Sequence, residues 1–131
     1  MREIKFRGKR LDNGEWIYGS LLVSHFKDDK KERYFITQFS GNYTFEHEVD
    51  PATVGQYTGL KDKNGREIYE GDIIGGSNGS INGWEWPFKS EIKWNDEECG
   101  FNPPILGYMD STHYYNVLGN IHDNPDLLKT E

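Results

Sequence analysis

Short runs of alternating apolar and polar residues dominate this chain. KERYFITQF and NYTFEHEVD alternate on either side of Ser40-Gly41-Asn42, and EIKFRGKRL, SEIKW and YYNVLGNI show the same pattern. A period of two is typical of half-buried strands, and a Ser-Gly-Asn cluster between two of them predicts a hairpin. No segment carries the 3.6-residue period of a long amphipathic helix. We therefore expect a mainly β chain of about eight to ten short antiparallel strands.

Two Asn-Gly pairs mark further reversals of the chain. Asn13-Gly14 and Asn64-Gly65 each lie between alternating segments. Asn-Gly favours a two-residue hairpin turn, because both central residues of that turn need positive φ. We expect each pair at an antiparallel reversal with positive φ.

Helical structure is expected to amount to one or two turns. Asp50-Pro51 can begin one, because Asp caps well and Pro is tolerated at the first helical position, and Asn124 can cap a second that begins at Pro125. The stretch GGSNGSING, residues 75–83, has little side-chain surface to pack and predicts a mobile loop.

Composition narrows the class of protein. The chain has 131 residues, the size of one domain, with 34% hydrophobic but 15% aromatic residues, which indicates a core built from a few large side chains. No apolar run approaches the ~20 residues of a membrane span. The charged start MREIKFRGKR does not have the form of a signal peptide, and Cys99 is the only cysteine. We expect a cytoplasmic protein that does not bind a membrane.

Basic residues are concentrated at the start of an acidic chain. The net charge of -7 opposes binding to nucleic acid through charge alone. In strand geometry Lys5, Arg7 and Lys9 share one face, with Ile4 and Phe6 on the other. A solvated strand face is the interpretation we favour, and contact with phosphates is the alternative.

The segment WEWPF follows the glycine-rich stretch. Alternation places Trp84, Trp86 and Phe88 on one face, and Pro87 removes a backbone donor, so an edge strand or an irregular segment is expected. We interpret these three aromatic residues as a partly exposed contact surface for another copy or for a partner.

No catalytic pattern stands out. The four histidines are scattered, and Glu46-His47-Glu48 would place its carboxylates and its imidazole on opposite strand faces, which opposes a shared metal ion. Acidic neighbours in Asp96-Glu97-Glu98-Cys99 raise a thiol pKa and reduce its reactivity. Neither a GxSxG elbow nor a phosphate-binding loop occurs. We expect no metal, no cofactor and no enzymatic activity.

Four ordered blocks carry a resemblance to a known family. MREIKFRG, VGQYTGLKDKNG, IYEGDII and LGNIHDNPDLL together resemble the YopX family of phage and prophage proteins across nearly the whole chain. The resemblance implies a single YopX-like domain over residues 1–131, with β-hairpins over 1–50 and a small barrel-like half over 51–131 whose core receives Ile68, Ile73 and Ile74. It also implies a phage-derived protein that self-associates, and it carries no known reaction, cofactor or catalytic residue.

Two classes of function follow from these observations. The first is a non-catalytic, homo-oligomeric interaction or assembly protein, with a phage or host protein as a further candidate partner. It would use strand edges and the surface of Trp84, Trp86 and Phe88. The second is a small nucleic-acid-binding module in phage replication or gene expression. In that module Lys5, Arg7 and Lys9 would contact phosphates while aromatic residues stack on bases.

Overall fold

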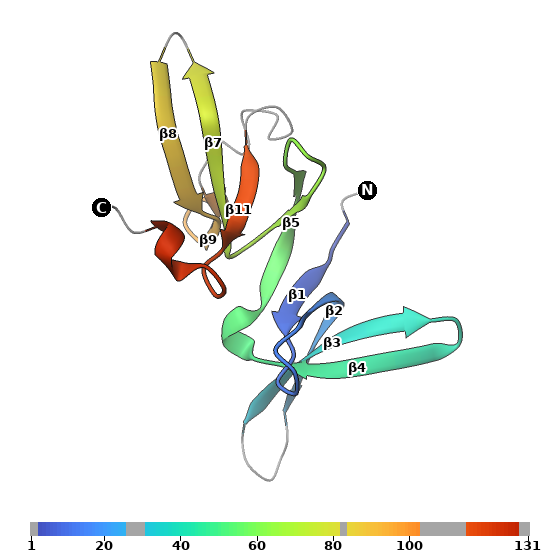
Figure 1. The fold of residues 1–131 in the computed structure, drawn as a ribbon. Helices are drawn as coiled ribbons and strands as arrows, with labels where there is room; N and C mark the ends of the chain where they lie inside the picture. Colours follow the sequence, from blue (N-terminus) through green and yellow to red (C-terminus); the bar gives the residue numbers. More distant parts are fainter. Residues whose placement is uncertain (1–2, 26–30, 82–83, 103–114, 129–131) are drawn as a thin grey trace. The chain divides into compact units, whose positions relative to one another are not determined.

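The computed structural model describes residues 3–25, 31–81, 84–102 and 115–128, and of residues 76–81 and 84–88 it describes the backbone alone. The chain divides into two compact units, Met1–Tyr57 and Thr58–Glu131. The boundary falls inside strand β5 (Gly55–Lys61), and each unit is considered by itself. The described residues form eleven strands, in antiparallel pairs, and two short 3₁₀ helices (Figure 1). The all-β class is therefore confirmed.

The first unit is one antiparallel sheet whose last long strand turns back to the first. Its strands are β1 (Phe6–Lys9), β2 (Trp16–His25), β3 (Glu32–Ser40) and β4 (Tyr43–Val49), in the order β4-β3-β2-β1 followed by the beginning of β5. Beyond its pairing with β3, β4 is held by a bridge between Arg10 and Val49. The Asp50 N–H donates to the Lys9 carbonyl at 2.8 Å, so the end of β4 lies beside the end of β1.

The core of the first unit is formed by residues of β2, β3 and β4. Ile17, Ile36 and Val49 are buried there, and the partly buried side chains against them are Phe6, Leu21, Tyr34 and Val54. Gly8 explains how β1 comes so close to β4, because a Cβ at Gly8 would lie only 2.9 Å from the Val49 Cβ. A larger residue would force the two strands apart.

The turn after β4 matches the expectation for Asp50-Pro51. A 3₁₀ helix, η1, spans Pro51–Thr53, and Asp50 Oδ1 accepts from the Ala52 N–H at 3.0 Å. Thr53 is buried, and its hydroxyl accepts from the Lys9 N–H at 2.8 Å. The predicted cap is confirmed, and Thr53 ties this turn to β1.

Both Asn-Gly pairs lie at reversals, but the turns are longer than predicted. Positive φ occurs at Gly14 (71°) and Gly65 (82°), whereas neither asparagine has it. At the second reversal the Asp62 N–H donates to the Arg66 carbonyl, and the Gly65 N–H donates to the Asp62 carbonyl at 3.0 Å. This is a three-residue loop with the glycine in the left-handed region. The two-residue turn with two positive φ angles was therefore wrong at both sites.

The second unit contains the remainder of β5 and six further strands. These are β6 (Glu67–Tyr69), β7 (Asp72–Ile81), β8 (Trp84–Glu91), β9 (Lys93–Asn95), β10 (Gly100–Asn102) and β11 (Asn116–Asn120), followed by the 3₁₀ helix η2 (Pro125–Leu128). Among the described residues the pairs are β5-β6, β10-β9 and a sheet ordered β11-β7-β8. These sheets stay open, so the expected barrel-like closure of residues 51–131 was wrong.

The core expected in this unit is present. Ile68, Ile73 and Ile74 are fully buried. The cluster formed with Ile68 and Ile74 contains Ile92, Tyr115 and Val117. The chain bends sharply at Glu70-Gly71-Asp72, between β6 and β7, with a φ of 92° at Gly71.

The glycine-rich stretch is not a loop, contrary to the prediction from its composition. β7 continues through it to Ile81 and pairs with β8, with a register shift between Gly76 and Gly79. Ladder hydrogen bonds use only the backbone, so a partner strand can hold a segment with few side chains. Among the described strands β8 lies at the edge of its sheet, which is one of the two outcomes expected from Pro87.

Buried Asp62 organises the reversal in the KDKNG motif. Its Oδ1 accepts from the N–H groups of Asn64 and Arg66, each at 2.9 Å. Its Oδ2 accepts from the Val117 N–H at 2.9 Å, on strand β11. One carboxylate therefore shapes the turn and fixes it to a strand distant in sequence.

A second polar network follows β11 in the motif LGNIHDN. Asn120 Oδ1 accepts from the N–H groups of His122 and Asp123, at 2.9 and 2.8 Å. The Asn124 side chain accepts from the Asn120 N–H, so it does not make the side-chain cap predicted for η2. The backbone carbonyl of Asn124 instead accepts from Leu127 at the start of η2.

Candidate interaction surface

Strands β3 and β4 extend beyond the rest of the sheet as a two-stranded arm. Pairing between β2 and β3 reaches Ser20 opposite Thr37, while β3 and β4 continue to Ser40 opposite Tyr43. Gly41, with a φ of 59°, makes the turn between them, as the sequence predicted. We call residues 38–45 the arm (Figure 1).

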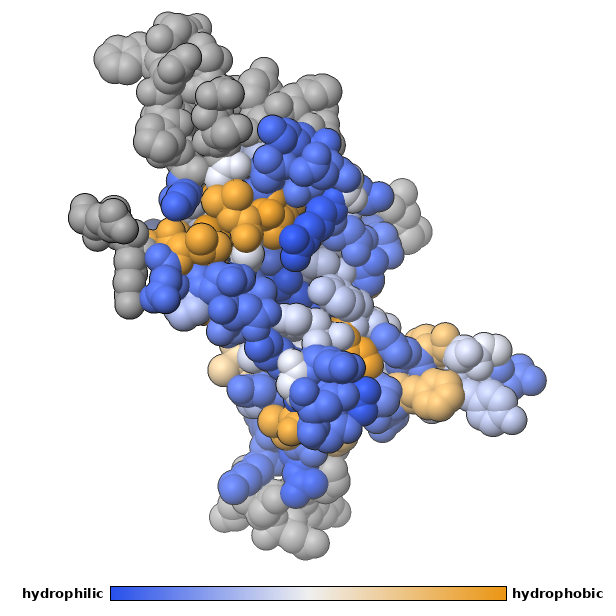
Figure 2. Space-filling view, viewed as in Figure 1, coloured by the Kyte–Doolittle hydropathy of each residue, from blue (hydrophilic) through white to orange (hydrophobic). Residues whose placement is uncertain are grey.

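Exposed aromatic side chains cover the arm. Phe39 and Tyr43 are each 73% exposed and Phe45 is 47% exposed. The register places Tyr43 and Phe45 on the face that also carries core residue Ile36, and Phe39 on the opposite face. Figure 2 shows hydrophobic colouring on this hairpin. Because every residue from Thr37 to Phe45 is uncharged, the arm combines apolar surface with the absence of charge.

A groove lies at the base of the arm, where β2 leaves β3. It encloses about 490 Å³, and its lining is uncharged: Tyr18, Gly19, Ser20, Thr37, Gln38, Phe39, Ser40 and Phe45. Gln38 Nε2 donates to the Tyr18 carbonyl at 2.9 Å and bridges the diverging strands. The groove extends the apolar surface of the arm toward the body of the unit.

The outer edge of β4 faces away from β3. The Glu48 carbonyl accepts from the Leu11 N–H at 3.0 Å, so the backbone groups of Glu48 point outward. In an antiparallel pair these directions alternate, and therefore those of Glu46 and Thr44 point outward too. Within the described residues, the strand pairing on this side of β4 is the bridge from Val49 to Arg10.

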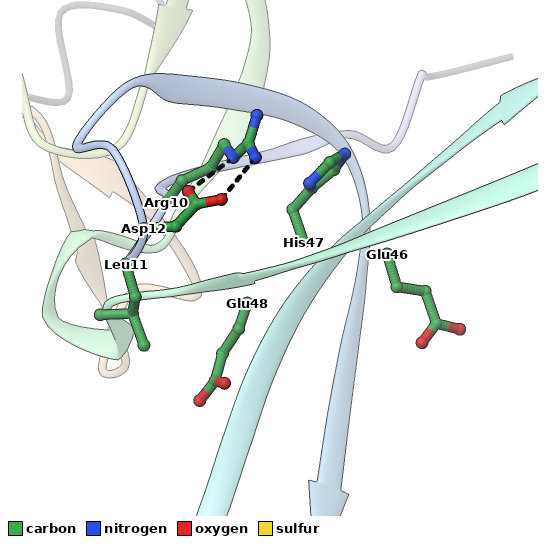
Figure 3. Close-up of a pocket in the computed structure, with 6 residues that line it drawn as sticks. All are labelled: Arg10, Leu11, Asp12, Glu46, His47 and Glu48. Carbon is green, nitrogen blue, oxygen red and sulfur yellow. Dashed lines mark hydrogen bonds and ion pairs between the residues drawn. The ribbon is translucent and has the colours of Figure 1, made fainter.

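A shallow pocket of about 320 Å³ lies beside this edge, lined by Arg10, Leu11, Asp12, Glu46, His47 and Glu48 (Figure 3). Arg10 Nε and Nη2 donate to the Asp12 carboxylate at 2.9 and 2.6 Å. This hydrogen bonding from Arg10 lowers the pKa of Asp12. The guanidinium is thus already engaged by a carboxylate of its own loop.

The same pocket contains the Glu46-His47-Glu48 sequence. Figure 3 shows the His47 ring on the Arg10 side of β4, with the side chains of Glu46 and Glu48 extending away from it. Over the described ranges, no three His, Cys, Asp or Glu residues group as a metal site would require. We assign this pocket no chemistry.

The basic residues Lys5, Arg7 and Lys9, on and just before β1, lie against aromatic rings. Arg7 is 3% exposed, and its guanidinium lies 4.6 Å from the centre of the Trp16 ring. Lys9 lies over the same ring at 5.5 Å, and Lys5 over Tyr57 at 5.5 Å. The interpretation of a solvated strand face was wrong for Arg7, because this side chain is buried against the Trp16 ring of the adjacent strand β2. Only Lys5 and Lys9 keep partial exposure.

For the aromatic segment WEWPF, residues 84–88, the structure describes the backbone alone. The side chains of Trp84, Trp86 and Phe88 lie outside the described residues, so their proposed contact role stays a prediction. A separate aromatic pair lies on the β9-β10 hairpin, where Trp94 is 44% exposed. Its ring packs edge to face against Phe101, with 5.2 Å between the ring centres. Cys99 lies exposed in the turn of that hairpin.

The geometry defines an antiparallel all-β protein that presents an uncharged aromatic arm among its described residues. The chain belongs to the YopX family, because the family model described as YopX protein matches residues 5–129. It is also similar to the crystal structure of protein EF1440 from Enterococcus faecalis, with 25% identity and a TM-score of 0.59. That match covers 98% of this chain and 100% of the other. No curated protein matches the chain.

One further observation concerns membranes. No helix in the part of the chain that the structure describes is long and apolar enough to cross one.

The arm was not among the sites predicted from sequence. The hairpin itself was expected, but its aromatic residues were interpreted as ordinary half-buried strand positions. The available signal was the run from Thr37 to Phe45, which has aromatic residues on both sides of the turn and no charge in a strongly charged chain. Such a run next to a tight turn has little neighbouring structure to bury it.

Proposed function

We propose that this protein is a non-catalytic interaction or assembly protein of phage origin that self-associates in the bacterial cytoplasm. The observation that carries the proposal is the arm, with Phe39 and Tyr43 both 73% exposed. Aromatic side chains in this position supply the contact area typical of protein interfaces. A long edge strand beside them offers backbone groups for pairing with another chain.

The charge distribution supports the arm as the place of contact. The chain carries a net charge of -7, so two copies repel each other over much of their surfaces. An uncharged projection reduces that repulsion, since charges more than ~8 Å apart are largely screened at physiological salt. The arm therefore offers an approach for a second acidic chain.

The assembly role predicts that changes in the arm alter mass without altering the fold. We expect light scattering on the natural protein at micromolar concentration to give a mass well above 15.2 kDa. The variant Phe39→Ser/Tyr43→Ser/Phe45→Ser should give a mass near that of one chain. Its far-UV circular dichroism should be unchanged, because these side chains lie outside the buried core.

A matched control separates the arm from general exposed apolar surface. Ile4 and Leu11 are 69% and 58% exposed but lie outside the arm. The variant Ile4→Ser/Leu11→Ser should keep the mass of the natural protein. If it dissociates as fully as the arm variant, association does not depend on the arm. A natural protein that stays at the mass of one chain contradicts self-association.

The surface of Trp84, Trp86 and Phe88 is a second proposed contact. These residues lie in β8, at the edge of its sheet among the described strands and next to the glycine-rich segment, which supports a role in contact. Replacing Trp84 and Trp86 together by Ser should then lower the mass of the assembly more than it lowers thermal stability. A lower melting temperature with unchanged mass would assign these side chains to the core.

Nucleic-acid binding is the alternative, and the observation that favours it is the ladder of cations over Trp16 and Tyr57. Lys5 and Lys9 could reach phosphates, whereas Arg7 is too deeply buried to do so in this arrangement. Titration with single-stranded and duplex oligonucleotides at low and high salt tests it. Affinity that falls steeply with salt and is lost in Lys5→Ala/Lys9→Ala would support this function. Absence of binding at low salt would exclude it.

A further inference from the structure

We propose that the partner at the arm is a second copy of this chain, paired antiparallel along the outer edge of β4 about a twofold axis through Phe45. This inference rests on the proposed self-association and specifies its geometry. The outward backbone groups of Thr44 and Glu46 would exchange hydrogen bonds with Glu46 and Thr44 of the second copy. Phe45 would face Phe45 of the second copy, and Tyr43 would face His47.

The hydrogen-bond directions restrict the possible registers. Thr44, Glu46 and Glu48 point outward, but Leu11 already engages the Glu48 carbonyl, so a centre at His47, which needs that group, is disfavoured. We therefore compare twofold antiparallel pairs centred on residues 44, 45 and 46. Centring on Thr44 would place Glu46 opposite Asn42, which belongs to the turn rather than to the strand. Centring on Glu46 would oppose two carboxylates and would require the Glu48 carbonyl, which Leu11 already occupies. The register centred on Phe45 avoids each of these conflicts.

The chemistry of this register is self-complementary. Glu46 lies opposite Thr44, so no like charges face each other across the pair. Phe45 meets its symmetry mate at a pair without hydrogen bonds, where Cα atoms approach to roughly 4.5 Å and aromatic side chains pack well. The loop at Leu11 ends the pairing just beyond His47.

A second copy fits this edge better than an unrelated charged partner. Residues 37–45 offer no charge with which to select a partner of opposite sign, whereas a twofold axis makes the segment its own complement. The repulsion expected between two chains of charge -7 is least where the uncharged arms project. Five paired residues per chain form a small interface, so we expect a dimer that depends on concentration.

Disulfide trapping tests the register directly. In a Cys99→Ser background, which removes the only cysteine, Phe45→Cys should form a covalent dimer under mild oxidation. The expected Cα separation of roughly 4.5 Å lies within the range that disulfides span. Denaturing, non-reducing electrophoresis should show a band at about twice 15.2 kDa. The control Phe39→Cys, at an aromatic position on β3 that is more exposed than Phe45, should stay at the mass of one chain.

A second pair of variants keeps Phe45 in place. Tyr43→Cys and His47→Cys, each in the Cys99→Ser background, should remain uncrosslinked alone and should form a heterodimer when mixed. Crosslinking in both experiments supports the edge pair. If the natural protein associates but neither experiment gives a dimer, the edge pair is wrong and the assembly proposal remains. If neither association nor crosslinking occurs, both fail.

Discussion

Replacing Asp62 by Ala is expected to lower the free energy of unfolding by about 3 kcal/mol, because buried N–H groups lose their acceptor. Asp62 is 2% exposed and accepts from Asn64, Arg66 and Val117. Water can reach part of the turn, but the Val117 N–H lies on a strand against the core. Urea unfolding followed by circular dichroism measures the loss. Asp62→Asn should be destabilised less, since an amide keeps one acceptor oxygen.

The matched control is Asp96→Ala. Asp96 is exposed and accepts from the Trp94 indole N–H at 2.7 Å, so its removal should change the free energy of unfolding by no more than about 0.5 kcal/mol. Equal losses in the two variants would contradict a special role for Asp62. In that case the KDKNG motif would have to be explained by something other than this turn.

Replacing Gly119 by Ala is expected to destabilise the protein by roughly 1 to 3 kcal/mol through overpacking. A Cβ at this position would meet the Asn124 side chain, with its Cγ at 2.8 Å, and the Leu127 Cδ1 at 2.9 Å. Asn124 cannot move freely, because its side chain accepts from the Asn120 N–H. Thermal unfolding of the variant should show a lower melting temperature.

A double-mutant cycle checks the proposed cause of that loss. Asn124→Ala removes the atoms that Cβ would meet first, so Gly119→Ala should be less harmful in the Asn124→Ala background than in the natural protein. Additive losses would show that the contact with Asn124 does not limit this position. If both predictions hold, Asp62 in KDKNG and Gly119 in LGNIHDN are required by the fold.

Much of the fold could be predicted from local chemistry. Alternation located most strands, glycines located the reversals, and Asp50 marked the 3₁₀ helix. The errors arose where partners distant in sequence decide the structure. β8 holds the glycine-rich segment in a strand, and Asp62 selects a longer turn than Asn64-Gly65 alone would favour. Neither interaction is visible in a short window of sequence.

The candidate surface was harder to predict than the fold. The alternation of apolar and polar residues cannot show that β3 and β4 extend beyond the end of β2. This extension leaves Phe39 and Tyr43 exposed. The alternation also cannot show that Trp16 lies beneath Arg7 and withdraws it from solvent. Exposure depends on the lengths of neighbouring strands and on their order in the sheet, and both are tertiary properties.

Hydrogen exchange on the natural protein, compared at low and high protein concentration, tests the central claim most directly. If copies meet along β4, amides of residues 43–47 should exchange more slowly at high concentration, most clearly at Thr44 and Glu46. Amides of β5 and β6 should not change. Unchanged exchange in residues 43–47 while another segment, such as residues 84–88, becomes protected would contradict assembly through the arm.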